Sequence, residues 1–188
     1  MNRKLLWLLL TAILLVSVHR AEGQQPAKIP GIGYLVAGYR SDILARTDAF
    51  RDGLRELGYE EAKNLVIGQR YAEGKIDRLS PLAAELVRMN VKVIVAAGPQ
   101  ATRRAKEATS TIPIVMGFHN DPIGSGLVAS LARPGGNVTG LSTLAPEISG
   151  KQLELLQEIV PKLARVAVLG NSTDPGNPQI LRKTSTYT

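Results

Sequence analysis

The clearest candidate for chemistry is the stretch VIVAAGPQAT, in which a run of apolar residues stops abruptly at Gly98. The run is typical of a buried strand, and the small residues after Pro99 are typical of a helix start. The first amide N–H groups of a helix lack internal partners, and the helix dipole adds partial positive charge there. The stretch therefore predicts an uncharged cradle for a carboxylate, or in the plainer alternative a simple strand-to-helix turn. The cradle would consist of Gly98, Pro99, Gln100, Ala101 and Thr102.

Two other predicted strand ends carry polar or aromatic side chains. Tyr39, which could stack on a ligand, and Ser41, which could bond to it, follow the first strand. His119 and Asn120 follow the fourth. Because the carboxyl ends of parallel strands meet at one edge, we expect these residues beside the Gly98 corner. In the alternative interpretation, Ser41 or its neighbour Asp42 caps a helix, and Asp121 caps the next one.

The sequence does not favour an enzyme. It contains no cysteine, and His119 is the only histidine after residue 19, which excludes a cysteine- or histidine-rich metal site. Neither a G-x-S-x-G nucleophile motif nor a phosphate-binding G-x-x-x-x-G-K-[ST] loop is present. We therefore predict no catalytic residue, metal or cofactor, and a lone His119 as a general base remains the enzymatic alternative.

The amino terminus has the pattern of a secretory signal. Arg3 and Lys4 precede an apolar run over residues 5–18, which is too short for a typical membrane span. Ala21 and Gly23 place small residues before a cleavage point. We predict a signal peptide over residues 1–23, a periplasmic location and no stable membrane insertion after its removal. The basic residues are scattered rather than clustered, so the formal net charge of +7 does not predict a nucleic-acid partner.

The 188-residue chain alternates between strand and helix patterns after this signal, and 44% of its residues are hydrophobic. Apolar runs bounded by turn residues predict strands over 32–37, 64–71, 91–97, 112–118, 138–141 and 166–169. Helical periodicity or caps predict helices over 41–57, 77–89, 99–109, 121–133 and 149–160. Such alternation is typical of βαβ units, so we predict an α/β fold with a mostly parallel, Rossmann-like (flavodoxin-like) sheet.

Six segments together resemble one known family. They are FRDGLRELGY (50–59), YAEGKIDRLSPLAAELV (71–87), VIVAAGPQAT (93–102), ATSTIPIVM (108–116), DPIGSGLVASLARPGGNVTGLS (121–142) and ISGKQLELLQEIVP (148–161). In this order they closely resemble the ABC-transporter substrate-binding proteins of the TrpX type. The resemblance runs from about residue 28 to about residue 182.

The resemblance implies a type I periplasmic binding protein, in which two hinged lobes close on a small solute and deliver it to an ABC permease. Several members are associated with aromatic amino acids. By resemblance, the Gly98–Thr102 loop and the loop after the first strand hold the ligand from the first lobe. Asn171 would approach from the second lobe. The absence of cysteine departs from lipid-anchored members and favours a soluble periplasmic protein.

The predicted organisation is a signal peptide over 1–23, an amino-terminal α/β lobe over 28–143, and a crossover with a truncated start of a second lobe over 144–188. For a chain of this length we expect weak or no ligand binding and poor solubility. Two other functions remain as alternatives. One is a ligand-sensing or docking module of a signalling system, and the other is a flavodoxin-like enzyme.

Overall fold

The computed structural model of this chain describes residues 29–143, 145–160, 162–163 and 165–167. They form a parallel five-stranded sheet with the order β2-β1-β3-β4-β5. The strands are β1 (Gly31–Val36), β2 (Val66–Tyr71), β3 (Val93–Ala97), β4 (Ile114–His119) and β5 (Val138–Ser142). This is the flavodoxin-like strand order, so the predicted Rossmann-like α/β class is confirmed.

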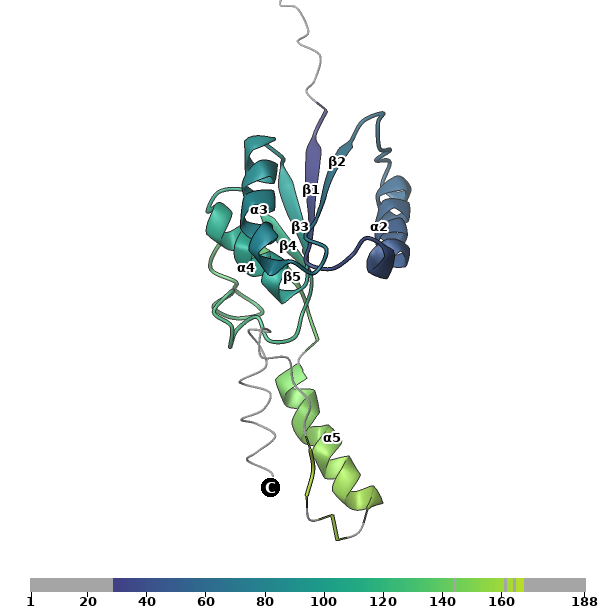
Figure 1. The fold of residues 1–188 in the computed structure, drawn as a ribbon, viewed down its shortest axis with the longest axis vertical. Helices are drawn as coiled ribbons and strands as arrows, with labels where there is room; N and C mark the ends of the chain where they lie inside the picture. Colours follow the sequence, from purple (N-terminus) through teal and green to yellow (C-terminus); the bar gives the residue numbers. More distant parts are fainter. Residues whose placement is uncertain (1–28, 144, 161, 164, 168–188) are drawn as a thin grey trace, which may run out of the picture.

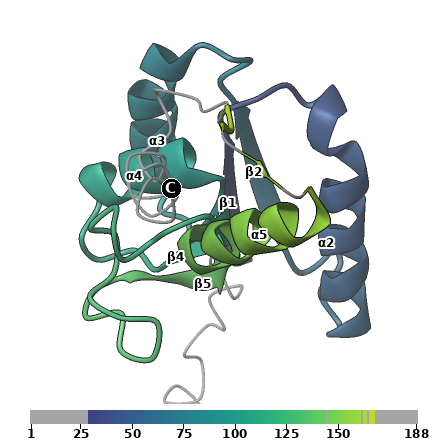
Figure 2. The ribbon, with the colours of Figure 1, turned by 90° about the horizontal axis from the view of Figure 1, so that it is seen from below.

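Helices cover both faces of the sheet (Figure 1). They are α2 (Leu44–Glu56) after the 3-10 turn η1 (Ser41–Ile43), α3 (Leu79–Arg88) after η2 (Ile76–Arg78), and α4 (Pro99–Ala108). The chain moves one way from β1 to β2 and the other way from β2 through β3 to β4. Right-handed crossovers therefore place α2 on one face and both α3 and α4 on the other. Figure 2, which looks at the sheet from below, shows the same separation.

The main core lies between the sheet and the α3–α4 layer. Leu35, Leu86 and Ile94 are fully buried there. Successive residues of a strand point to opposite faces, so Tyr34 and Val36 point toward α2 instead. On that side the ring of Tyr34 packs on Phe50, with 5.5 Å between centroids. The cluster on the α2 face is smaller, and part of this face stays open beside β4.

The helix predicted over residues 121–133 is wrong, because the chain makes a single turn there. The amide of Ser125 bonds the Asp121 carbonyl as in a helix, but Gly126 then adopts a φ of 71°. The amides of Gly126 and Leu127 bond back to the carbonyls of Ile123 and Pro122. These two bonds are the Schellman pattern that ends a helix, so a glycine in the left-handed region stops it after one turn.

The last described helix, α5 (Ala145–Ile159), begins four residues before the Ser149 capping box predicted from the sequence. It follows β5 and projects from the carboxyl edge of the sheet (Figures 1 and 2). Val166 and Ala167 are not in a strand, although the sequence predicts one from 166 to 169. The predicted signal at residues 1–23, residues 168–169 and Asn171 lie outside the described residues. No described helix has the length and apolar character needed to cross a membrane.

Candidate functional site

The strand order creates a crevice where β1 and β3 end side by side. The chain leaves β1 toward α2 and leaves β3 toward α4, on opposite faces of the sheet. A ligand site in an open parallel sheet forms at such a point. Here the gap holds a cavity of about 240 Å³, which we call the switch-point cavity. Its lining comes from the end of β1 through Gly38, the end of β3 through Gln100, and Ile43, Arg46 and Phe118.

Gly98 forms the corner between β3 and α4 in a conformation that other residues avoid. Its φ is 97° and its ψ is 169°, and a Cβ atom at this position would lie 3.2 Å from Cζ of Phe118. Pro99 follows as the first residue of the helix. Glycine, which has no Cβ atom, therefore permits both these backbone angles and the close contact with the aromatic ring.

The five predicted cradle residues fall into two groups, those that line the cavity and those that are buried. Gly98, Pro99 and Gln100 line the switch-point cavity. The side chains of Ala101 and Thr102 are fully buried. The amide and the hydroxyl of Thr102 both donate to the Gly98 carbonyl oxygen, at 3.0 and 2.9 Å, so Thr102 fastens the corner.

Tyr39 and Ser41, the two residues predicted after β1, lie at the same edge but are not part of the cavity lining. The side chain of Tyr39 is 53% exposed and lies close to Gly74. The hydroxyl of Ser41 donates to Oδ1 of Asp42 at 3.0 Å. Neither Ser41 nor Asp42 caps a helix, because both lie within the 3-10 turn and no side chain caps its start. The ligand contact predicted for Tyr39 and Ser41 stays a prediction.

His119 ends β4 at the same edge, but its ring is fully buried. Its Nδ1 atom accepts the amide of Asp121 at 3.0 Å, which places the proton of a neutral ring on Nε2. That Nε2 lies 3.4 Å from the hydroxyl of Ser125. To contact a ligand, His119 would have to leave these partners. The amide oxygen of Asn120 lies 3.5 Å from the hydroxyl of Thr143.

Asp121 caps the single turn that follows β4. Its Oδ1 accepts the amide of Gly124 at 2.8 Å, three residues ahead. A carboxylate oxygen bonding that amide is the usual geometry of a helix N-cap. The capping role predicted for Asp121 is therefore confirmed.

Sequence reasoning missed Arg46 and Phe118. The Cζ atom of Arg46 lies 5.5 Å from the centroid of the Phe118 ring. Both residues also line a second cavity of about 410 Å³ between α2 and the open face of β3, β4 and β5, which we call the apolar cavity. Position 118 could have been found, because it directly precedes the predicted His119. Nothing local distinguishes Arg46 from other arginines on the charged face of α2.

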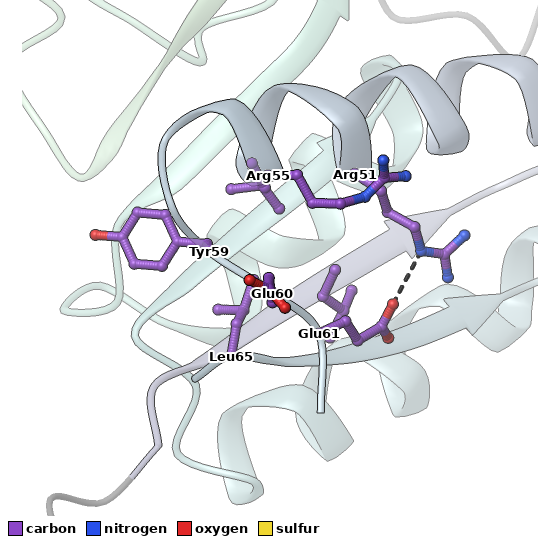
Figure 3. Close-up of a pocket in the computed structure, with 8 residues that line it drawn as sticks. Arg51, Arg55, Tyr59, Glu60, Glu61 and Leu65 are labelled. Atoms are coloured by element: carbon purple, nitrogen blue, oxygen red, sulfur yellow. Dashed lines mark hydrogen bonds and ion pairs between the residues drawn. The ribbon is translucent and has the colours of Figure 1, made fainter. Parts of the chain in front are cut away.

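A third cavity, of about 230 Å³, lies where α2 leads into β2 (Figure 3). The charged residues that line it are all in ion pairs, and Arg51 and Glu61 pair across it. Nε of Arg51 contacts Glu61 at 2.9 Å, a second nitrogen contacts Asp48 at 3.4 Å, and Arg55 pairs with Asp52. The cavity lies at the amino ends of the strands, opposite the switch point, and the Arg51–Glu61 pair ties α2 to the turn that leads into β2.

Comparison with known proteins identifies a family for most of the chain. Residues 40–187 match the family described as ABC transporter substrate binding protein. A tyrosine-binding protein from Clostridioides difficile strain R20291 is 32% identical over 125 residues. That match covers 66% of this chain and 36% of the relative.

Solved structures with the same fold include one with a bound ligand and one that is ligand-free. A conserved domain protein from Vibrio cholerae superposes with a TM-score of 0.76 at 31% identity, covering 85% of this chain and 53% of that one. An ABC domain in complex with L-Trp, from Streptococcus pneumonia, superposes with a TM-score of 0.74 at 27% identity, covering 84% of this chain and 52% of that one. A ligand-free, open substrate binding protein with adhesive properties, from Clostridium difficile, superposes with a TM-score of 0.65 at 25% identity. That match covers 85% of this chain and 53% of that one. The chain thus spans about half the length of these solved relatives.

Proposed function

We propose, from the premise that this chain belongs to the ABC transporter substrate-binding protein family, that it binds a small amino-acid-like carboxylate for import. The observation that carries the proposal is the switch-point cavity, which the Gly98 corner and the first turn of α4 border. Amides at a helix start favour an anionic group such as a carboxylate. One relative is named a tyrosine-binding protein and another holds L-Trp, which supports an aromatic amino acid.

The same proposal includes export and a membrane partner. Residues 1–23 would act as a cleaved signal peptide, and the mature protein would deliver its solute to an ABC permease from the periplasm. The test is expression in a Gram-negative host, followed by mass measurement of the protein released from the periplasm. A mature chain that begins near Gln24 is expected. A full-length chain retained in the cytoplasm would contradict export.

Ligand binding is tested by ¹H–¹⁵N NMR titration of the chain with L-tryptophan, L-tyrosine and L-glutamate. Because the switch-point cavity lies at one edge of one sheet, we expect millimolar affinity for the two aromatic amino acids. The amide signals of Gly38, Gly98 and Gln100 should move, and those of the third cavity, such as Glu61, should not. Micromolar affinity would contradict a one-sided site, and unmoved switch-point amides would contradict the proposed function.

We infer binding without turnover. The family that matches residues 40–187 is described as a substrate binding protein, which supports this inference. Prolonged incubation with L-tryptophan, followed by mass spectrometry of the solute, should recover it unchanged. A new product that forms in proportion to protein concentration would instead support the enzymatic alternative.

A further inference from the structure

The switch-point cavity and the apolar cavity are neighbours that share four lining residues. These are Ile43, Arg46, Ala97 and Phe118. The smaller cavity is bordered by the backbone of Gly38 and of the α4 start. The larger is bordered by aromatic and aliphatic side chains, including Phe50 and Val115. A solute with a polar head and an apolar body can therefore lie across both.

The apolar cavity leaves hydrophobic surface open to water. Leu141 is 69% exposed and Phe118 is 37% exposed, and both border the cavity. Its volume of about 410 Å³ is within the range of small-molecule sites. Covering apolar surface with an apolar group is favourable, so the cavity suits the apolar body of the solute.

Arg46 lines both cavities, and among the described residues no carboxylate lies within ion-pair distance of its guanidinium. Arg51 and Arg55 on the same helix are paired with acids, as described above. A guanidinium binds a carboxylate through two parallel hydrogen bonds, so Arg46 is suited to the head group.

Phe118 links Arg46 to the Gly98 corner. Its ring lies under the guanidinium at 5.5 Å from the centroid, a distance at which a cation and an aromatic face attract. The same ring approaches the Gly98 backbone so closely that a Cβ atom there would meet it at 3.2 Å. Phe118 thus positions Arg46 and borders both cavities.

We propose, building on the proposed function, that Arg46 binds the carboxylate of the solute and that the apolar cavity takes its aromatic or other bulky apolar side chain. Neither cavity has an aspartate or glutamate among its lining residues. This lobe therefore recognises the carboxylate and the apolar body and does not recognise an ammonium group. It should bind 3-indolepropionate about as well as L-tryptophan, and tryptamine much more weakly.

The test is NMR titration of the full chain with L-tryptophan, 3-indolepropionate and tryptamine. Arg46→Gln should weaken binding of the two carboxylates by about tenfold, since a charge-assisted pair becomes neutral, and Arg46→Lys should recover part of the loss. The matched control is Arg55→Gln on the same helix, which should bind like the wild type. Unchanged amide signals of the α3–α4 layer would verify that each variant is folded.

The outcomes separate this inference from the proposed function. If the wild type binds L-tryptophan and Arg46→Gln binds it equally well, the inference is overturned and the function stands. Tryptamine binding as tightly as L-tryptophan would also overturn it. If Leu141 and Val115 signals shift with protein concentration and not with solute, the apolar cavity is a contact between copies and the inference fails. If the wild type binds neither carboxylate, the proposed function fails as well.

Discussion

The hydroxyl of Thr102 donates a hydrogen bond to the carbonyl oxygen of Gly98 at 2.9 Å, and the Thr102 amide donates to the same oxygen at 3.0 Å. The first turn of α4 is therefore fastened to the residue that forms the corner after β3. Because Thr102 is fully buried, its hydroxyl has no water as an alternative partner. The shape of the candidate site depends on this internal bond.

Thr102→Val should lower the stability of the protein and loosen the corner. Valine keeps the volume but loses the donor, which costs about 1 kcal/mol for a buried hydrogen bond. Urea unfolding measures this loss, and the Gly98 amide signal reports the local change. The control is Thr47→Val on α2, where the hydroxyl makes the equivalent bond to the Ile43 carbonyl at 3.0 Å. It should lose similar stability but leave the Gly98 signal in place, and a shift there would argue against a local effect.

Gly98→Ala should destabilise the protein by about 1–3 kcal/mol, because alanine is strained at this φ and its Cβ meets Phe118. The matched variant is Gly53→Ala inside α2, one turn before its end, where an added Cβ has no atom within 4 Å. That change should stabilise by up to about 1 kcal/mol, since alanine is the better helix former. Thermal unfolding of both variants distinguishes them. Equal melting temperatures would show that the corner tolerates a side chain.

His119→Leu tests whether this buried ring supports the fold or contacts the solute. Leucine fills much of the space but leaves the Asp121 amide without its acceptor, which costs about 1–3 kcal/mol. We expect lower stability in urea, with the affinity of the folded fraction for L-tryptophan changed little. A variant of unchanged stability that no longer binds L-tryptophan would instead establish His119 as a ligand contact.

Tyr71 should make stability fall at alkaline pH. Burial raises the pKa of Tyr71 above its ordinary value of 10.0, and the positive charges of Arg40 and Arg51 offset part of this effect. A raised pKa keeps the folded phenol neutral where the unfolded one ionises. The contribution of Tyr71 to the free energy of unfolding is thus complete below pH 10.0, and it is lost as the pH rises through the raised pKa of the folded state.

The measurement is urea unfolding between neutral and alkaline pH, together with ultraviolet titration of the phenols. Tyr71→Phe should flatten the alkaline loss of stability and remove a late-titrating phenol from the spectrum. Tyr59→Phe removes another phenol from an exposed position and controls for the smaller chromophore count. An alkaline profile that Tyr71→Phe leaves unchanged would assign the loss to other groups.

Local sequence patterns were sufficient to predict most of the strands and helices and the fold class. The apolar runs of the five described strands and the periodicity of α2, α3 and α4 are properties of neighbouring residues, so the α/β class and the corner at Gly98 were predictable. The helix predicted over 121–133 failed because its apolar spacing fits a helix, whereas Gly126 ends the turn. Backbone freedom at one glycine outweighed the hydrophobic pattern.

Sequence alone determined the five strands, the helices α2, α3 and α4, and which residues stand at the carboxyl edge, because periodicity and glycine–proline corners act over a few residues. Tertiary structure decided which of those edge residues face a cavity. It turned His119 and Thr102 inward to internal partners, and it brought Arg46 of α2 onto Phe118 of β4. Those two residues are far apart in the chain, and only the packing of α2 on the sheet makes them neighbours.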